Sequence, residues 1–112
     1  MPWTLCVQCC DHRFQKAGRA LRRHLGIKSG HYDLISIPGG AGDLSTFQNA
    51  MALLHDKRLD DRLAVLTIHE DCAAGATETD LAKTVNAAKE FFPEVKGYIL
   101  KLDGTFELIH DS

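Results

Sequence analysis

The sequence lacks an excess of basic residues: 13 lysines and arginines stand against 15 acidic residues, which leaves a formal net charge of -2. Nucleic acids and anionic membranes are usually bound by basic surfaces, so neither is expected as a partner. The chain also lacks an apolar run of membrane-spanning length. Its first apolar stretch, Trp3 to Val7, is too short for the core of a secretory signal peptide. These absences predict a cytoplasmic protein that acts on a small or neutral ligand.

Internal repeats, linkers and low-complexity segments are also absent, and 112 residues suit one hydrophobic core. Residues 1–112 are therefore predicted to form a single domain. A secreted disulfide framework is not indicated either, because Cys9 and Cys10 are adjacent and Cys6 falls inside a predicted strand. The four cysteines are expected to be buried apolar residues, metal ligands or nucleophiles, and Cys6 is assigned to the first group.

Apolar segments of strand type alternate with segments of helical periodicity. Strands are predicted over residues 3–9, 32–37, 63–68, 97–102 and 105–109. The buried faces of three intervening helices are predicted to carry Phe14, Ala17, Leu21 and Leu25; then Leu44, Phe47, Met51 and Leu54; then Leu81, Val85, Ala88 and Phe92. The first helix should stop at Gly26. The second should start at Asp43 or Ser45, and the third near Thr77 or Thr79, where Thr77 and Asp80 have capping-box spacing; Pro93 should end it.

Alternation of strands and helices predicts an α/β fold: a three-layer open sheet with parallel strands in the order 2-1-3-4. Asp103-Gly104 is typical of a two-residue hairpin turn, so a terminal strand 5 should run antiparallel to strand 4. The strand order reverses between strands 1 and 3. Ligands of such sheets bind at the carboxyl ends of the strands beside that switch point, which here carry residues 9–13 and 69–72.

The first predicted helix also carries four basic residues between its apolar positions. Lys16, Arg19, Arg22 and Arg23 are expected to lie on its outer face and to be solvated.

Cysteine and histidine side chains occur at metal-ligand spacing at the two strand ends. His69 and Cys72 are three residues apart, and Cys9 ends the first strand. Two thiolates and one imidazole suit Zn²⁺, and three protein ligands leave a fourth position, as in catalytic zinc sites. The sequence therefore predicts Cys9, His69 and Cys72 as zinc ligands, with the fourth position open to water or taken by Asp11.

Asp11 and Arg13 alternate with Cys9 along what is predicted to be an extended segment, so all three should point into one cleft. An arginine can hold a carboxylate through a bidentate pair. Such a pair would keep Asp11 ionised and aimed toward the metal, where its carboxylate could orient a hydroxide. Asp11 and Arg13 are accordingly the predicted catalytic residues.

At these residues the chain resembles the β-class carbonic anhydrases, and in particular their short, carbonic-anhydrase-like branch. The resemblance rests on Cys9-Cys10-Asp11-His12-Arg13, Ala41-Gly42 and His69-Glu70-Asp71-Cys72, and it covers nearly the whole chain. It implies a zinc lyase in which a zinc-bound hydroxide attacks CO₂ to give bicarbonate, with Asp11 and Arg13 as a dyad beside the metal. It also implies a homodimer or higher homo-oligomer, because the family's cleft often takes side chains from a second subunit.

Two features depart from the family pattern. The usual loop Arg-Asn-Ala-Gly-Asn is replaced by Gly39-Gly40-Ala41-Gly42-Asp43, so polar groups near the cleft are missing, and the long N-terminal helical arm is absent. Three alternatives to CO₂ hydration follow. They are hydrolysis of a CO₂ analogue such as COS or CS₂, a metal-binding module without turnover in which Asp11 closes the fourth position, and metal-free chemistry with Cys72 as nucleophile or sulfur carrier.

Overall fold

The structure is a computed structural model that describes residues 4–55, 63–72 and 74–111, without the side chains of residues 52–55. Its strands are β1 (Thr4–Cys9), β2 (Tyr32–Ile37), β3 (Leu63–His69), β4 (Glu94–Leu100) and β5 (Phe106–Asp111). Its helices are α1 (Gln15–His24), α2 (Leu44–His55) and α3 (Glu78–Ala88), with short 3₁₀ turns η1 (His12–Phe14) and η2 (Gly40–Gly42). None of the helices described here combines the length and apolar character needed to cross a membrane.

The five strands form one sheet in the order β2-β1-β3-β4-β5, as predicted. The first four are parallel, and β5 is antiparallel to β4. The β1–β3 register runs from Thr4 opposite Leu63 to Val7 opposite Leu66. Beyond that pair, the Thr67 hydroxyl donates a buried hydrogen bond of 2.7 Å to the Val7 carbonyl oxygen. The carboxyl ends of β1 and β3 therefore lie side by side at the switch point.

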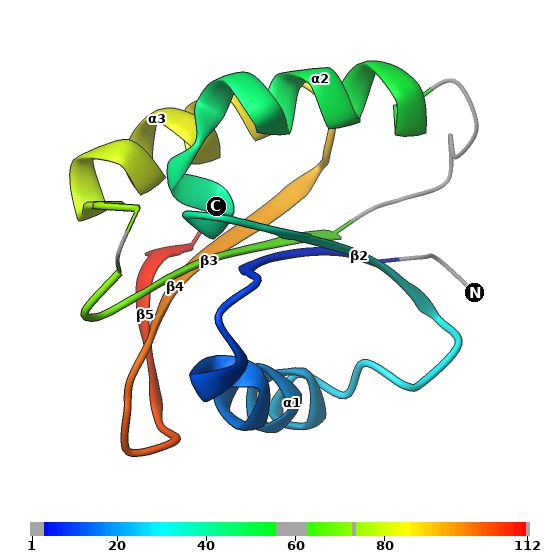
Figure 1. Ribbon diagram of the computed structural model, residues 1–112. Coiled ribbons are helices and arrows are strands. Elements are labelled where there is room, and N and C mark those ends of the chain that lie inside the picture. The colour runs from blue at the N-terminus through cyan, green and yellow to red at the C-terminus, as the bar shows by residue number, and fades with distance from the viewer. Residues whose placement is uncertain (1–3, 56–62, 73, 112) are drawn as a thin grey trace.

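Helices cover both faces of the sheet and make three layers (Figure 1): α1 lies on one face, and α2 and α3 lie on the other. On the α1 face, Leu21 belongs to a buried cluster with Cys6 and Tyr98. On the opposite face, Phe47 of α2 and Val85 of α3 belong to a second cluster. This three-layer arrangement explains the near-continuous apolar runs of β1 and β3, since both faces of these strands are buried.

Several predicted boundaries shift in the structure. Helix α3 begins after a Thr77 cap that forms the predicted capping box with Asp80, yet it ends at Ala88, well before Pro93. Phe92 is buried although it lies outside the helix, so the apolar spacing alone extended the prediction too far. The β4–β5 connection spans residues 101–105 and is longer than a two-residue turn, with a hydrogen bond from the Lys101 amide to the Thr105 carbonyl. Residue 3 and the Leu54 side chain lie outside the described residues.

Arg22 is the main departure from the predicted solvated face of α1. Arg22 is only 9 % exposed, and its Nη1 donates a hydrogen bond of 3.1 Å to Oε1 of Gln8 in β1. The helix comes close to β1 at Gly18, where an added Cβ would lie 2.6 Å from the same Gln8 oxygen. Absence of a side chain at position 18 therefore leaves room for the Gln8–Arg22 contact.

Candidate metal centre

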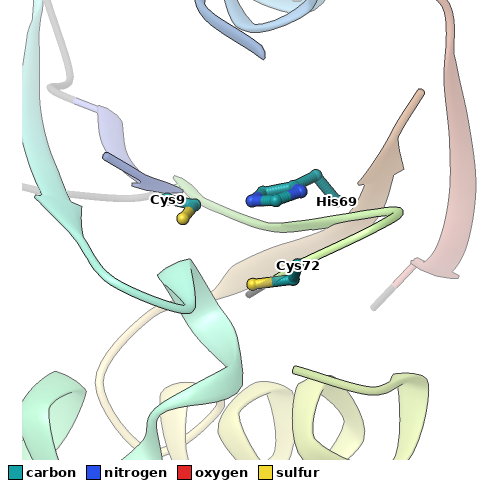
Figure 2. A group of neighbouring side chains, drawn as sticks. All are labelled: Cys9, His69 and Cys72. Atoms are coloured by element: carbon teal, nitrogen blue, oxygen red, sulfur yellow. The ribbon is translucent and has the colours of Figure 1, made fainter. Parts of the chain in front are cut away.

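Cys9, His69 and Cys72 meet at the carboxyl edge of the sheet. Cys9 ends β1, His69 ends β3, and Cys72 follows in the next loop. One potential ligand atom from each residue lies within 4.8 Å of the others, and the three side chains point toward one another (Figure 2). Cys9 and His69 are buried, at 7 % and 3 % exposed, and Cys72 is half-buried. The structure thus brings together all three residues that the sequence analysis selected as ligands.

The His69 ring is oriented by its surroundings. Nδ1 lies 2.7 Å from the Glu70 carbonyl oxygen, and the ring stacks on Phe14 with centroids 3.9 Å apart. A proton on Nδ1 would be donated to that carbonyl, which leaves a lone pair on Nε2. Nε2 is buried and has no hydrogen-bond partner among the described residues. A buried ring nitrogen of this kind is costly unless it has a partner, and a metal ion is a suitable one.

The two sulfurs complete a donor set that a divalent ion can use. The pKa of the Cys9 thiol is raised, chiefly because the thiol is buried and also because Cys72 is close by. Backbone hydrogen bonds from Asp11 and Gly39 lower this pKa and offset part of the rise. Two close thiolates repel one another, and a cation between them removes that repulsion. A set of two sulfurs and one nitrogen matches zinc in softness and in number. The residues therefore fit a zinc ion with one further coordination position.

Asp11 is held by Arg13, and its carboxylate is not part of the three-residue cluster. Arg13 Nη2 lies 2.7 Å from Asp11 Oδ2, and Nε lies 3.2 Å from Oδ1 and 3.1 Å from Oδ2. These bonds lower the pKa of Asp11 to about 2. The segment is not extended as predicted: Asp11 caps the 3₁₀ turn η1 and accepts a hydrogen bond of 3.0 Å from the Arg13 amide. That turn, rather than strand alternation, forms the Asp11–Arg13 pair.

Arg13 also contacts the loop that carries Cys72. Its Nη1 lies 3.1 Å from Asp71 Oδ2, and its Nη2 lies 3.1 Å from the Asp71 carbonyl oxygen. Asp71 has a φ of 54°, a left-handed conformation that aspartate tolerates better than most residues. One guanidinium therefore joins the segment after β1 to the segment after β3. Sequence analysis did not identify Asp71, because the His-x-x-Cys pattern contains no signal for its backbone conformation.

Glu70 anchors the same loop to β4 and the hairpin that follows. Its backbone amide donates to the Leu100 carbonyl at 3.1 Å, and its Oε1 accepts a hydrogen bond of 2.6 Å from the Leu102 amide. Sequence analysis assigned Glu70 no function of its own. In the structure it fixes the segment between His69 and Cys72 to the neighbouring strand.

The glycine-rich loop after β2 lies against the ends of β1 and β3. A Cβ on Gly40 would lie 2.6 Å from the Thr67 carbonyl oxygen and 2.8 Å from the Cys9 amide nitrogen, and its φ is 54°. A side chain at position 40 would therefore collide with the backbone of β1 and β3. Gly40 and Ala41 are buried in the short turn η2, and Gly40 lies against the backbone of Cys9.

Metal-free chemistry at Cys72 would need the start of α3 close enough to lower the pKa of the thiol. The helix begins at Glu78 with Thr77 as its cap, and Cys72 precedes that cap by five positions in the sequence. The effect of a helix terminus is confined to its first turn.

Comparisons with known proteins support the fold. The sequence matches no family model, and no curated protein is similar to it. Among solved structures, the chain is similar to a crystal structure of a carbonic anhydrase from Streptococcus mutans, with a TM-score of 0.60 and 16 % sequence identity. The match covers 96 % of this chain and 81 % of that one. The chain therefore has a carbonic-anhydrase-like α/β fold with a group of cysteine and histidine side chains that could hold a metal ion.

Proposed function

We propose that the protein is a zinc lyase of the β-class carbonic anhydrase type, which interconverts CO₂ and bicarbonate. The observation that carries the proposal is the Cys9–His69–Cys72 group, in which the buried His69 Nε2 has no hydrogen-bond partner among the described residues. The similar fold of a carbonic anhydrase supports it. Small, uncharged CO₂ also agrees with the charge balance of the chain.

Each residue of the site has a role in this proposal. Cys9, His69 and Cys72 hold zinc, which when bound acidifies a water molecule and supplies the nucleophile for CO₂. Asp11 stays ionised and accepts a hydrogen bond in the cleft, which orients the attacking group. Arg13 aims Asp11 and holds the two ligand-bearing segments together through Asp71. The Glu70 carbonyl fixes the His69 tautomer.

We further propose that residues 1–112 form one domain and assemble as a homodimer, in which a second subunit completes the cleft. Mass measurement by light scattering after size-exclusion chromatography tests the assembly: a mass of two chains is expected, and a monomer that is fully active would contradict it.

The lyase proposal is tested by metal analysis and stopped-flow CO₂ hydration on the same sample. Freshly purified protein is expected to contain one zinc ion per chain and to accelerate hydration. Cys9→Ser should lose zinc and at least about 10²-fold in rate, because one of three ligands is removed. Cys10→Ser is the matched control, since Cys10 is an exposed neighbour outside the cluster, and it should retain both zinc and rate. Full zinc loading without any hydration would contradict the proposal.

A second candidate is a zinc-binding module without turnover. It is favoured by the loop at Gly39 and Gly40, which offers backbone but no polar side chain beside the metal centre. Zinc-loaded protein that hydrates neither CO₂ nor its analogues COS and CS₂ would support this alternative. Hydrolysis of COS or CS₂ without CO₂ hydration would instead identify a related hydrolase that uses the same residues.

A further inference from the structure

A second site is indicated on the α1 side of the sheet, away from the metal centre. An open pocket of about 310 Å³ is lined by Arg19, Arg22, Arg23, Ile27, Ser29 and Tyr32. Its residues come from α1, from the segment that follows it and from the first residue of β2. Because β1 and β2 are parallel, Tyr32 at the amino end of β2 lies beside Thr4, at the other end of β1 from Cys9.

Arg22 is the buried member of this pocket. Its Nη1 donates to Gln8 Oε1, and its guanidinium carbon lies 4.9 Å from the centroid of the Tyr32 ring. Gln8 is itself fixed by a hydrogen bond of 3.0 Å from its Nε2 to Gln15 Oε1. The guanidinium is therefore held in one place by an amide and an aromatic ring, both of which are neutral.

The ion pairs described among residues 4–55, 63–72 and 74–111 involve Arg13, Lys96 and Lys101, and Arg19, Arg22 and Arg23 take part in none of them. A buried charge is costly when its partners are neutral, and the two exposed arginines beside it add repulsion. An anion with several oxygens would offset both effects, since guanidinium groups bind such oxygens through paired N–H donors.

We propose that this pocket binds a phosphate group, either as inorganic phosphate or as a small phosphomonoester. Three guanidinium groups match a dianion with three or four oxygens better than they match a single carboxylate. Ser29 adds a hydroxyl at the pocket wall, while Ile27 and the Tyr32 ring offer apolar surface beside the phosphate position. The chain's net charge of -2 makes a nucleic-acid backbone a poor source of that phosphate.

The proposal is tested by titrating ¹⁵N-labelled protein with inorganic phosphate and, separately, with phenyl phosphate, at constant ionic strength. Saturable amide shifts are expected over residues 19–32. Tighter binding of phenyl phosphate would identify a phosphomonoester as the ligand class, and equal binding would identify the free ion. Arg19→Gln and Arg23→Gln should each weaken binding about tenfold, because each removes a charge-assisted hydrogen-bond donor. Both residues are exposed, so the fold should tolerate the change.

Lys16→Gln is the matched control: it removes one positive charge from the same helix, outside the pocket, and should leave the affinity within about twofold. Cys9→Ser should also bind phosphate normally, which separates this site from the metal centre. Shifts confined to residues 9–13 and 69–72, shifts that sodium chloride reproduces, or equal losses in Lys16→Gln and Arg19→Gln would each overturn the proposal.

Discussion

Asp11 accepts hydrogen bonds from both the side chain and the backbone of Arg13, and this fixes its charge as well as its direction. With a pKa of about 2 it is ionised throughout the range in which CO₂ hydration is measured. Its contribution to catalysis should therefore come from orientation and hydrogen bonding, without a change of protonation.

Asp11→Asn is expected to lower kcat by about 10²-fold or more, the usual contribution of a positioned acid-base group. Zinc content should not change, because Asp11 is outside the three-ligand group. Since Asp11 is already ionised between pH 5 and 9, its replacement should lower the plateau of the pH–rate profile without removing a titration step from that range. Stopped-flow hydration across that range, with metal analysis, measures both quantities.

Asp71→Asn is the matched control for Asp11→Asn. It removes the exposed carboxylate contact of the same arginine, keeps the Asp71 carbonyl contact, and retains a residue type that accepts a positive φ. Exposed ion pairs contribute little, so kcat/KM should fall by less than about threefold. An unchanged plateau in Asp11→Asn would contradict the proposed role of Asp11 in orienting the attacking group.

Among the elements, the turn η2 approaches the backbone of β1 and β3 closely at Gly40. Gly40→Ala places a Cβ against Thr67 and Cys9 at a positive φ, so it combines backbone strain with a steric clash. Unfolding free energy should fall by about 2–5 kcal/mol, from roughly 1–2 for the backbone and 1–3 for the overlap. Urea denaturation of the variant and the parent protein measures this difference.

Gly30→Ala provides the comparison. Gly30 has a φ of 83° but no heavy atom within 4 Å of its Cβ position, so only the backbone term applies, about 1 kcal/mol. Equal destabilisation by the two substitutions would mean that the contact at Gly40 relaxes without cost.

The sequence was sufficient to predict the sheet and its order, because the signals for these elements are strong and local. The strand over residues 32–37 was predicted to the residue, and the Thr77 cap placed the start of α3. Helix α3 was predicted too long because Phe92 continues the apolar spacing in a turn. Periodicity reports which side chains are buried, and it does not report which backbone bonds continue the helix.

The positions of the candidate ligands were also predictable, since parallel strands present their carboxyl ends at one edge of the sheet. The surroundings of those ligands could not be predicted from the sequence. The left-handed backbone of Asp71, the close approach at Gly40 and the burial of Arg22 all depend on backbone distances between segments far apart in the sequence. The sequence pattern shows the charge of Arg22 but not the amide acceptor that Gln8 provides, so the residue resembles a solvated one.

For the molecule as a whole, exposed carboxylates link stability to pH. Arg13 lowers the pKa of Asp11, while hydrogen bonds from Thr46 and Thr105 lower the pKa values of Asp43 and Asp103. Each folded-state pKa lies below the unfolded value of about 3.9, so this stabilisation is complete above that value and is lost as the pH falls toward 2.

The thermal midpoint is therefore expected to be nearly constant from pH 7 to 5 and to fall below pH 4, as measured by circular dichroism. Asp43→Asn should make the fall of the thermal midpoint below pH 4 less steep and leave the midpoint at pH 7 nearly unchanged. Asparagine caps α2 as well as aspartate does, but it does not titrate. If the thermal midpoint of Asp43→Asn falls below pH 4 as steeply as that of the parent protein, Asp43 does not contribute to the pH dependence of stability.

The β1–β3 register has a consequence for the order in which the chain assembles. Thr67 and Val7, which are hydrogen-bonded beside the metal centre, lie 60 residues apart in sequence. In an unfolded chain His69 and Cys72 are still neighbours, whereas Cys9 joins them only after two crossover connections have formed. An ion that requires all three donors binds the native chain alone and stabilises it by mass action. Metal affinity would then report directly on the pairing of two strands.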